Sequence, residues 1–113
     1  MSVALDKLLR LVVDKQATGL ELLTGEPPGI RLRGDLRPLN LPPLTSEDTL
    51  RFMRALASAQ HQSEFVEKGS CEFGLPFEGN AHFLVQVFKW KGHCGIRLRL
   101  VPRKPREVDN PDA

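Results

Sequence analysis

The sequence predicts an α+β fold, in which helices pack against one face of a mostly antiparallel sheet of roughly six strands. Two stretches, near residues 5–13 and 45–59, carry apolar residues at helical spacing. Two others, within residues 20–38 and 71–101, alternate apolar and polar residues as strands do. Because strands and helices come in blocks rather than in strict alternation, a parallel sheet is not expected. At 113 residues the chain is long enough for one small domain.

The helices are predicted from apolar stripes and from capping residues. In the first helix one stripe is formed by Leu5, Leu8, Leu9, Val12 and Val13. Gly19 is expected to cap this helix in the left-handed conformation. Thr45 and Asp48 form a capping-box pattern at the start of the second helix. A short helix or turn over "HQSEFVEKG" is expected to close at Gly69.

The strands are predicted from alternation and from turn residues. "LELLT" precedes a Pro-rich turn, and Gly34-Asp35 between two alternating runs indicates a hairpin. Three later strands are "CEFGL", "AHFLVQVFKW" and "IRLRLV". The combined periodicities predict a core made of Leu5, Leu9, Val12, Phe52, Leu56, Phe83, Val85, Val87, Leu98 and Leu100.

The strand "HFLVQVFKW" is unusual because both of its faces carry large apolar residues. Phe83, Val85 and Val87 alternate along one face. Leu84, Phe88 and Trp90, the only Trp of the chain, fall on the other. Either a helix of the same chain covers this second face, or the face is a contact surface for a partner. The sequence leaves both possibilities open.

The charge of the chain is unevenly distributed. Residues 79–106 contain seven Lys or Arg residues and no Asp or Glu. Residues 1–78 contain nine Lys or Arg residues and eleven Asp or Glu residues. A basic segment is either a solvated edge or a surface that meets something anionic. One alternative function is therefore a nucleotide-sensing or nucleic-acid-sensing module that uses residues 79–106, with Trp90 as a stacking platform.

Several other functions lack support in the sequence. No segment matches the phosphate-binding loop G-x-x-x-x-G-K-[ST], and the histidines have no evident nucleophile or carboxylate partner. His and Cys spacing fits no zinc motif, and Cys71 and Cys94 are expected to be free thiols. We therefore predict no catalytic residue, no metal and no cofactor, and hence no enzyme. Without a signal sequence or a long apolar run, we expect a cytoplasmic protein that does not insert into a membrane.

The order of these segments resembles the start of the pilus-retraction (twitching-motility) ATPases and their type II secretion relatives. That family opens with L-x-x-L-L-x-x-x-V-x-x-x-A-S-D-L-H-L, a P-P turn, a hairpin R-x-D-G-x-L-x-P-L and a capped helix beginning L-T-x-E-D. The corresponding run here is "LDKLLRLVVDKQATGLELLTGEPPGIRLRGDLRPLNLPPLTSEDT". The family's R-F-R-V-N-x-F-x-Q-R-G and its strand ending in L-R-x-I-P correspond to "HFLVQVFKWKG" and "IRLRLVP". The resemblance spans about residues 4–102 and implies a PAS-like N-terminal domain over residues 1–102. Residues 103–113 are expected to be a disordered polar tail.

The departures from the family pattern bear on function. The RecA-like motor domain that follows this region in the family, with its Walker motifs, is missing from the sequence. Thr18, Gly19 and Glu21 stand where the family has Ser, Asp and His. His82 and Leu84 stand where it has arginines that reach toward nucleotide at the neighbouring motor domain. That role does not carry over to Leu84, and Lys does not replace a bidentate Arg.

These observations together predict a non-catalytic interaction or regulatory module. It would act by self-association into a homo-oligomer or by docking to a pilus or secretion motor ATPase, with nucleic acid a less favoured partner. Interface cores favour Trp, Phe and Arg and contain few acidic residues. Residues 79–106 have this composition, since they contain Trp, Phe and Arg and no Asp or Glu. The predicted interaction surface consists of Leu84, Phe88, Lys89, Trp90, Lys91, Arg97 and Arg99.

Overall fold

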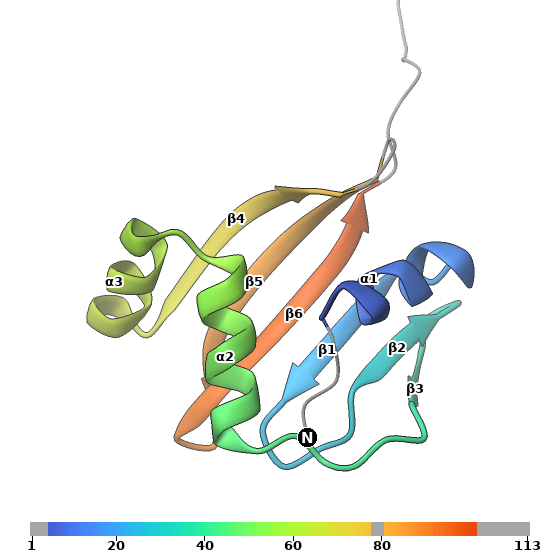
Figure 1. Cartoon of the computed structure of the whole chain (residues 1–113), viewed down its shortest axis with the longest axis horizontal. Helices are drawn as coiled ribbons and strands as arrows, with labels where there is room; N and C mark the ends of the chain where they lie inside the picture. The colour runs from blue at the N-terminus through green and yellow to red at the C-terminus, as the bar shows by residue number, and fades with distance from the viewer. Residues whose placement is uncertain (1–4, 78–80, 102–113) are drawn as a thin grey trace, which may run out of the picture.

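A computed structural model describes residues 5–77 and 81–101 (Figure 1). The described chain folds into three helices and a single six-stranded sheet. The helices are α1 (Leu5–Asp14), α2 (Ser46–Leu56) and α3 (Ala59–Lys68). The strands are β1 (Gly19–Leu23), β2 (Gly29–Leu32), β3 (Asp35–Pro38), β4 (Ser70–Pro76), β5 (His82–Trp90) and β6 (His93–Val101). The predicted α+β class and the predicted order of elements are confirmed.

The sheet has the strand order β3-β2-β1-β6-β5-β4, and every neighbouring pair is antiparallel. The two blocks of strands predicted from sequence are joined at the centre, where β1 pairs with β6. In this pairing Leu20 lies opposite Leu98, and Glu21 lies opposite Arg97. The central strands therefore come from the two ends of the chain, which brings distant residues into one surface.

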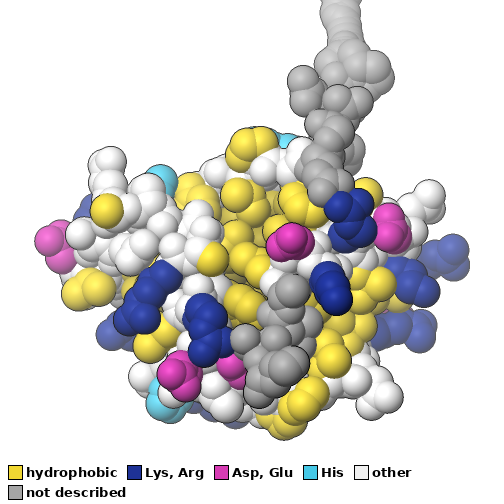
Figure 2. Space-filling model, viewed as in Figure 1, with side chains coloured by type: hydrophobic (Ala, Val, Ile, Leu, Met, Phe, Trp, Pro, Cys, Tyr) yellow, Lys and Arg dark blue, Asp and Glu magenta, His cyan; other side chains and the backbone are white. Residues whose placement is uncertain are grey.

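The hydrophobic core lies between the helices and one face of the sheet. On β5, Phe83, Val85 and Val87 are fully buried on this face, and Ile96 and Leu98 lie beside them on β6. Most of the predicted core is buried, including Leu9, Val12 and Phe52 from the helices, while Leu5, Leu56 and Leu100 are partly buried and pack against it. Figure 2 shows this side of the molecule, with hydrophobic side chains visible between the helices and charged ones around them.

Polar groups fix α2 on this core. The predicted capping box is present: the Asp48 backbone N–H donates to Thr45 Oγ1 at 3.0 Å, and the Thr45 N–H donates to Asp48 Oδ2 at 3.0 Å. Further along the helix, the buried Thr49 hydroxyl lies 2.8 Å from the Thr24 hydroxyl, which donates to the Cys94 carbonyl. These bonds connect α2 to the chain after β1 and to β6.

Two tight turns shape the hairpins. Arg33-Gly34 and Lys91-Gly92 all have positive φ, as the two-residue type I′ turn requires. The predicted hairpin after β2 is confirmed, but its loop is Arg33-Gly34 rather than Gly34-Asp35, because Asp35 already pairs with Leu32. Gly69 caps α3 in the left-handed conformation, as predicted.

The prediction that Gly19 caps α1 is wrong. The helix ends at Asp14, Gln16 adopts the positive φ, and Gly19 begins β1. A Cβ atom at position 19 would lie 2.7 Å from the Leu98 carbonyl oxygen. Glycine is needed there because the backbone of β6 approaches closely, and not because of its φ angle.

The remaining predictions about the chain can be placed briefly. Cys71 and Cys94 are free and buried, as predicted, and burial raises the pKa of the Cys94 thiol to about 11. No helix in residues 5–77 and 81–101 is long and apolar enough to cross a membrane. The predicted disordered tail, residues 103–113, lies outside the described residues.

Candidate interaction surface

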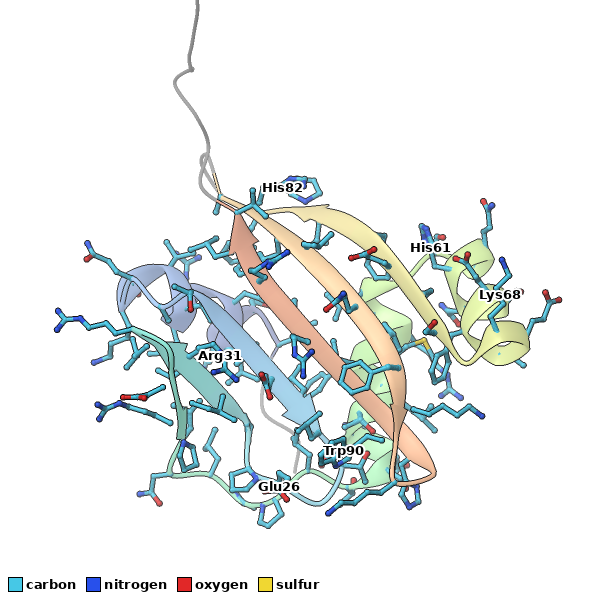
Figure 3. The ribbon with its side chains drawn as sticks, turned by 180° about the vertical axis from the view of Figure 1, so that it is seen from behind. Glu26, Arg31, His61, Lys68, His82 and Trp90 are labelled. Carbon is cyan, nitrogen blue, oxygen red and sulfur yellow. The ribbon has the colours of Figure 1, made fainter. Side chains whose placement is uncertain are left out.

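The face of the sheet opposite the helices is not covered by any helix of the described chain. Figure 3 shows this face from behind, with Arg31 and Trp90 on it and the helices on the far side of the sheet or at its edge. We call it the open face. Strand alternation places on it the side chains of Glu21, Leu23, Arg31, Leu36, Glu72, Leu84, Gln86, Phe88, Trp90, Arg97 and Arg99.

One end of the open face is an apolar cluster built around a glycine. Phe88 pairs with Gly95 on β6, which in turn pairs with Leu23 on β1. A Cβ atom on Gly95 would lie 2.8 Å from the Phe88 ring, 3.0 Å from the Trp90 Cβ and 3.1 Å from a Leu23 methyl. The absence of a side chain at position 95 therefore lets these three residues close over the strand. Phe88, Trp90 and Leu23 nevertheless remain partly exposed.

Trp90 has two features that matter for recognition. Its indole Nε1 is buried but has no hydrogen-bond partner among the described residues. A buried donor without an acceptor costs free energy. The Lys91 ammonium lies 5.3 Å from the centroid of the Trp90 ring. One part of the Trp90 ring is thus in contact with a cation of the same chain.

The middle of the open face is an ionic cluster around Glu21. Its Oε2 lies 2.8 Å from Arg31 Nη2 and 3.4 Å from Arg97 Nε. The Glu21 side chain is only 8% exposed, although it lies on the uncovered side, because the two arginines flank it. Arg31 also donates to the Gly34 carbonyl at 3.1 Å, and the Arg97 guanidinium lies 5.4 Å from the centroid of the Phe88 ring. The cluster thus connects β2, β1, β6 and β5.

A pocket of about 330 Å³ opens beside this cluster, above Gly19. Gly19 pairs with Arg31 on one side and with Arg99 on the other, so no side chain stands between these two arginines. The pocket is lined by Thr18, Gly19, Leu20, Glu21, Arg31, Arg97, Leu98 and Arg99. Arg99 is exposed and forms no ion pair with another described residue.

The structure brings most of the predicted interaction residues together. Leu84, Phe88, Trp90, Arg97 and Arg99 share the open face, and Lys91 lies in the turn next to Trp90. Lys89 does not join them: strand alternation directs it to the helix side of the sheet. There it lies near Gly69 and lines a pocket with Leu50 and Phe65.

Glu21 and Arg31 are the two residues of the ionic cluster that sequence reasoning did not select for the interaction surface. Each is a charged residue between apolar neighbours in a strand, a pattern that indicates only an outward-facing position. Their partners became evident once β1 was placed between β2 and β6. Among the described residues, no group of three or more His, Cys, Asp or Glu could hold a metal ion.

This fold is similar to that of the N-terminal region of pilus-motor ATPases. No protein-family model matches the chain. It is 30% identical over 96 residues to the type IV pilus ATPase PilU of Pseudomonas aeruginosa and 31% identical over 98 residues to the type IV pilus retraction ATPase PilT of the same organism. These alignments cover 85% and 87% of this chain but 25% and 28% of the relatives. The chain is homologous to the N-terminal region of these ATPases and spans about a quarter of their length, which confirms the resemblance.

Two solved structures of related ATPases contain a region with a similar fold. The crystal structure of the pilus retraction motor PilT with bound ADP matches with a TM-score of 0.82 and 26% identity, over 90% of this chain and 30% of that one. The ATPase DotB of Legionella pneumophila matches with a TM-score of 0.73 and 18% identity, over 87% of this chain and 28% of that one, which is evidence for the fold alone.

Proposed function

We propose that this chain is a non-catalytic interaction module that docks through its open face, either to a pilus or secretion motor ATPase or to another copy of itself. The observation that carries the proposal is the open face, where partly exposed Phe88 and Trp90 lie next to arginines and no helix of the described chain covers them. Trp and Arg are among the residues that most often dominate binding energy in protein interfaces, and the open face carries both.

The proposal includes one expected absence, that of ATP turnover, and a cellular location. The sequence has no phosphate-binding loop, and the aligned region is only about a quarter of each related ATPase. We therefore expect no ATP turnover by the purified chain above that of a heat-inactivated control. We also propose that the protein acts in the cytoplasm.

Nucleotide or nucleic-acid sensing receives less support from the geometry. A stacking platform needs a free aromatic face, but Lys91 lies over Trp90 and Arg97 lies over Phe88. Two of the three open-face arginines, Arg31 and Arg97, already share the Glu21 carboxylate. This alternative predicts salt-dependent binding of ADP or single-stranded nucleic acid by the parent chain.

The test compares binding by the parent chain, by Trp90→Ala and by a matched control. The control is Val66→Ala, because Val66 is an exposed apolar residue (74%) on α3, away from the open face. A PilT-type ATPase is titrated by calorimetry, and self-association is followed by light scattering at low and high concentration. We expect Trp90→Ala to weaken the observed association about thirtyfold and Val66→Ala to leave it unchanged.

Two results would contradict the proposal. One is a parent chain that neither binds the ATPase nor associates with itself. The other is association that Trp90→Ala leaves intact in a variant whose thermal unfolding matches that of the parent. Saturable binding of ADP or nucleic acid in place of protein would favour the alternative function.

A further inference from the structure

A second pocket lies on the helix side of the sheet, where strand alternation places Lys89. It has a volume of about 270 Å³ and is bordered by α2, α3 and the β5–β6 hairpin. Its apolar lining consists of Leu50 from α2, Phe65 from α3 and Cys94 from β6. Phe65 is 8% exposed and Cys94 is 3% exposed, so the pocket reaches the edge of the hydrophobic core.

One positive charge accompanies this apolar lining. Lys89 is the only Lys or Arg that lines the pocket, and no Asp or Glu lines it. The Lys89 ammonium forms no ion pair with another described residue. The Ser46 hydroxyl, on the first residue of α2, also lines the pocket and has no hydrogen-bond partner among the described residues. The pocket therefore combines apolar side chains with one ammonium and one hydroxyl group that are available to a ligand.

The stem of Lys89 lies along the end of α3. Its Cγ and Cε atoms are 3.9 and 3.8 Å from the position that a Cβ atom of Gly69 would occupy. Gly69 caps α3 with a φ of 83°, a conformation that favours glycine. Because the stem lies against the protein while the residue as a whole is exposed, the ammonium lies at the mouth of the pocket and not in its floor.

We propose that this pocket binds a small monocarboxylate with an apolar body. The body would lie on Leu50, Phe65 and Cys94 and displace water from their apolar surface. The carboxylate would pair with the Lys89 ammonium and accept a hydrogen bond from the Ser46 hydroxyl. The inference does not rest on the proposed function, because the pocket lies on the side of the sheet opposite the open face.

The charge and the size of the pocket select this class of ligand. A single cation balances one carboxylate, whereas a phosphate ester, with a charge of about −1.5 to −2 at pH 7, would keep unbalanced charge beside apolar side chains. A neutral apolar molecule would gain nothing from Lys89, and an Asp or Glu side chain of a partner has too little apolar surface for the floor. The volume of about 270 Å³ is below the range of about 300–1,000 Å³ typical of drug-sized ligands, which excludes a nucleotide.

The test is an NMR titration of the parent chain with phenylacetate at constant ionic strength. Three parallel arms use 2-phenylethanol, which lacks the charge, acetate, which lacks the apolar body, and phenyl phosphate, which carries more negative charge. We expect saturable shifts of the Leu50 and Cys94 amide signals with phenylacetate, while the amide of Leu84 on the open face stays unchanged. Phenylacetate should bind about tenfold more tightly than each of the other three compounds.

Two variants assign the charge to its residue. Lys89→Met keeps the apolar stem and removes the ammonium, so it should lower the affinity for phenylacetate about tenfold, to that of 2-phenylethanol. Lys91→Met is the matched control, because Lys91 is an exposed lysine two residues further along that does not line the pocket, and it should leave the affinity unchanged.

Three results would overturn the inference. The first is the absence of saturable shifts at Leu50 and Cys94 with phenylacetate. The second is binding of 2-phenylethanol or phenyl phosphate that is as tight as that of phenylacetate. The third is a Lys89→Met variant that unfolds at the temperature of the parent and binds phenylacetate equally well. If Lys89→Met does not fold, the comparison of the four compounds on the parent chain decides.

Discussion

The two faces of the sheet are made by the same strands, yet they differ in almost every physical property. On the helix side of β5, Phe83, Val85 and Val87 are fully buried among aliphatic residues. On the open side, Leu84, Phe88 and Trp90 of the same strand remain partly exposed, next to a cluster of charged residues. Burial of the first set supplies folding free energy, whereas the second set leaves apolar surface partly exposed. Under the proposed function, stability and recognition are divided between opposite faces of one strand.

The largest expected effect separates the two faces by stability. Leu98→Ala removes a fully buried side chain from the helix side and should lower the free energy of unfolding by about 3 kcal/mol. Leu84→Ala, on the neighbouring strand but on the open face, should lower it by about 1 kcal/mol or less. Urea unfolding of both variants measures the difference. A larger loss for Leu84→Ala than for Leu98→Ala would mean that the two faces are exchanged, as a one-residue shift of register would do.

A smaller effect concerns the ionic cluster of the open face. Glu21→Gln removes the carboxylate charge that Arg31 and Arg97 share. This substitution should lower the free energy of unfolding by about 1–2 kcal/mol. The loss should be limited, because both arginines are partly exposed and water screens them. Glu72→Gln is the matched control, since Glu72 is an exposed acid of the same face whose carboxylate accepts a hydrogen bond from the neutral Gln86 side chain. If the two variants are equally stable, the Glu21 cluster contributes nothing to folding.

The smallest expected effect is on the helix side and depends on pH. The hydrogen bond from the Thr45 backbone N–H holds the pKa of Asp48 below its ordinary value of 3.8. The stabilisation by Asp48 is therefore fully present above that ordinary value and is lost as the pH falls through the lower folded pKa. Asp48→Ala should cost about 0.5 kcal/mol at neutral pH. The thermal unfolding temperatures of the parent and of Asp48→Ala should converge as the pH is lowered into the acid range. A difference between the two temperatures that stays constant at all pH values would contradict this prediction.

Much of the fold could be predicted because local patterns agree with it. The stripe that contains Leu9 and Val12, the capping box at Thr45 and the alternation of Val85 and Val87 all indicate structure within a few residues. These features gave the element order and most of the core. The turn around Gly34 was misplaced by one residue, because the sequence does not show which residue first pairs across the hairpin.

The candidate site depended more on long-range pairing and was predicted less completely. Alternation correctly grouped Leu84, Phe88 and Trp90, but the same rule, applied strictly, sends Lys89 to the other face. The shared carboxylate of Glu21 became visible only when β1 was found between β2 and β6. The pocket at Gly19 arises from the close approach of the β6 backbone, which no local pattern encodes.

The most direct test of the division between the faces uses the single Trp of the chain. Trp90 gives one indole N–H signal in a nitrogen-15 NMR spectrum, and its Nε1 is buried without a partner. During titration with a PilT-type ATPase, this signal should shift or broaden together with the side-chain signals of Arg97 and Arg99, while the Val66 methyl signals should stay unchanged. If the ATPase binds and Val66 responds while Trp90 does not, the partner docks on the helix side and the open face is not the recognition surface.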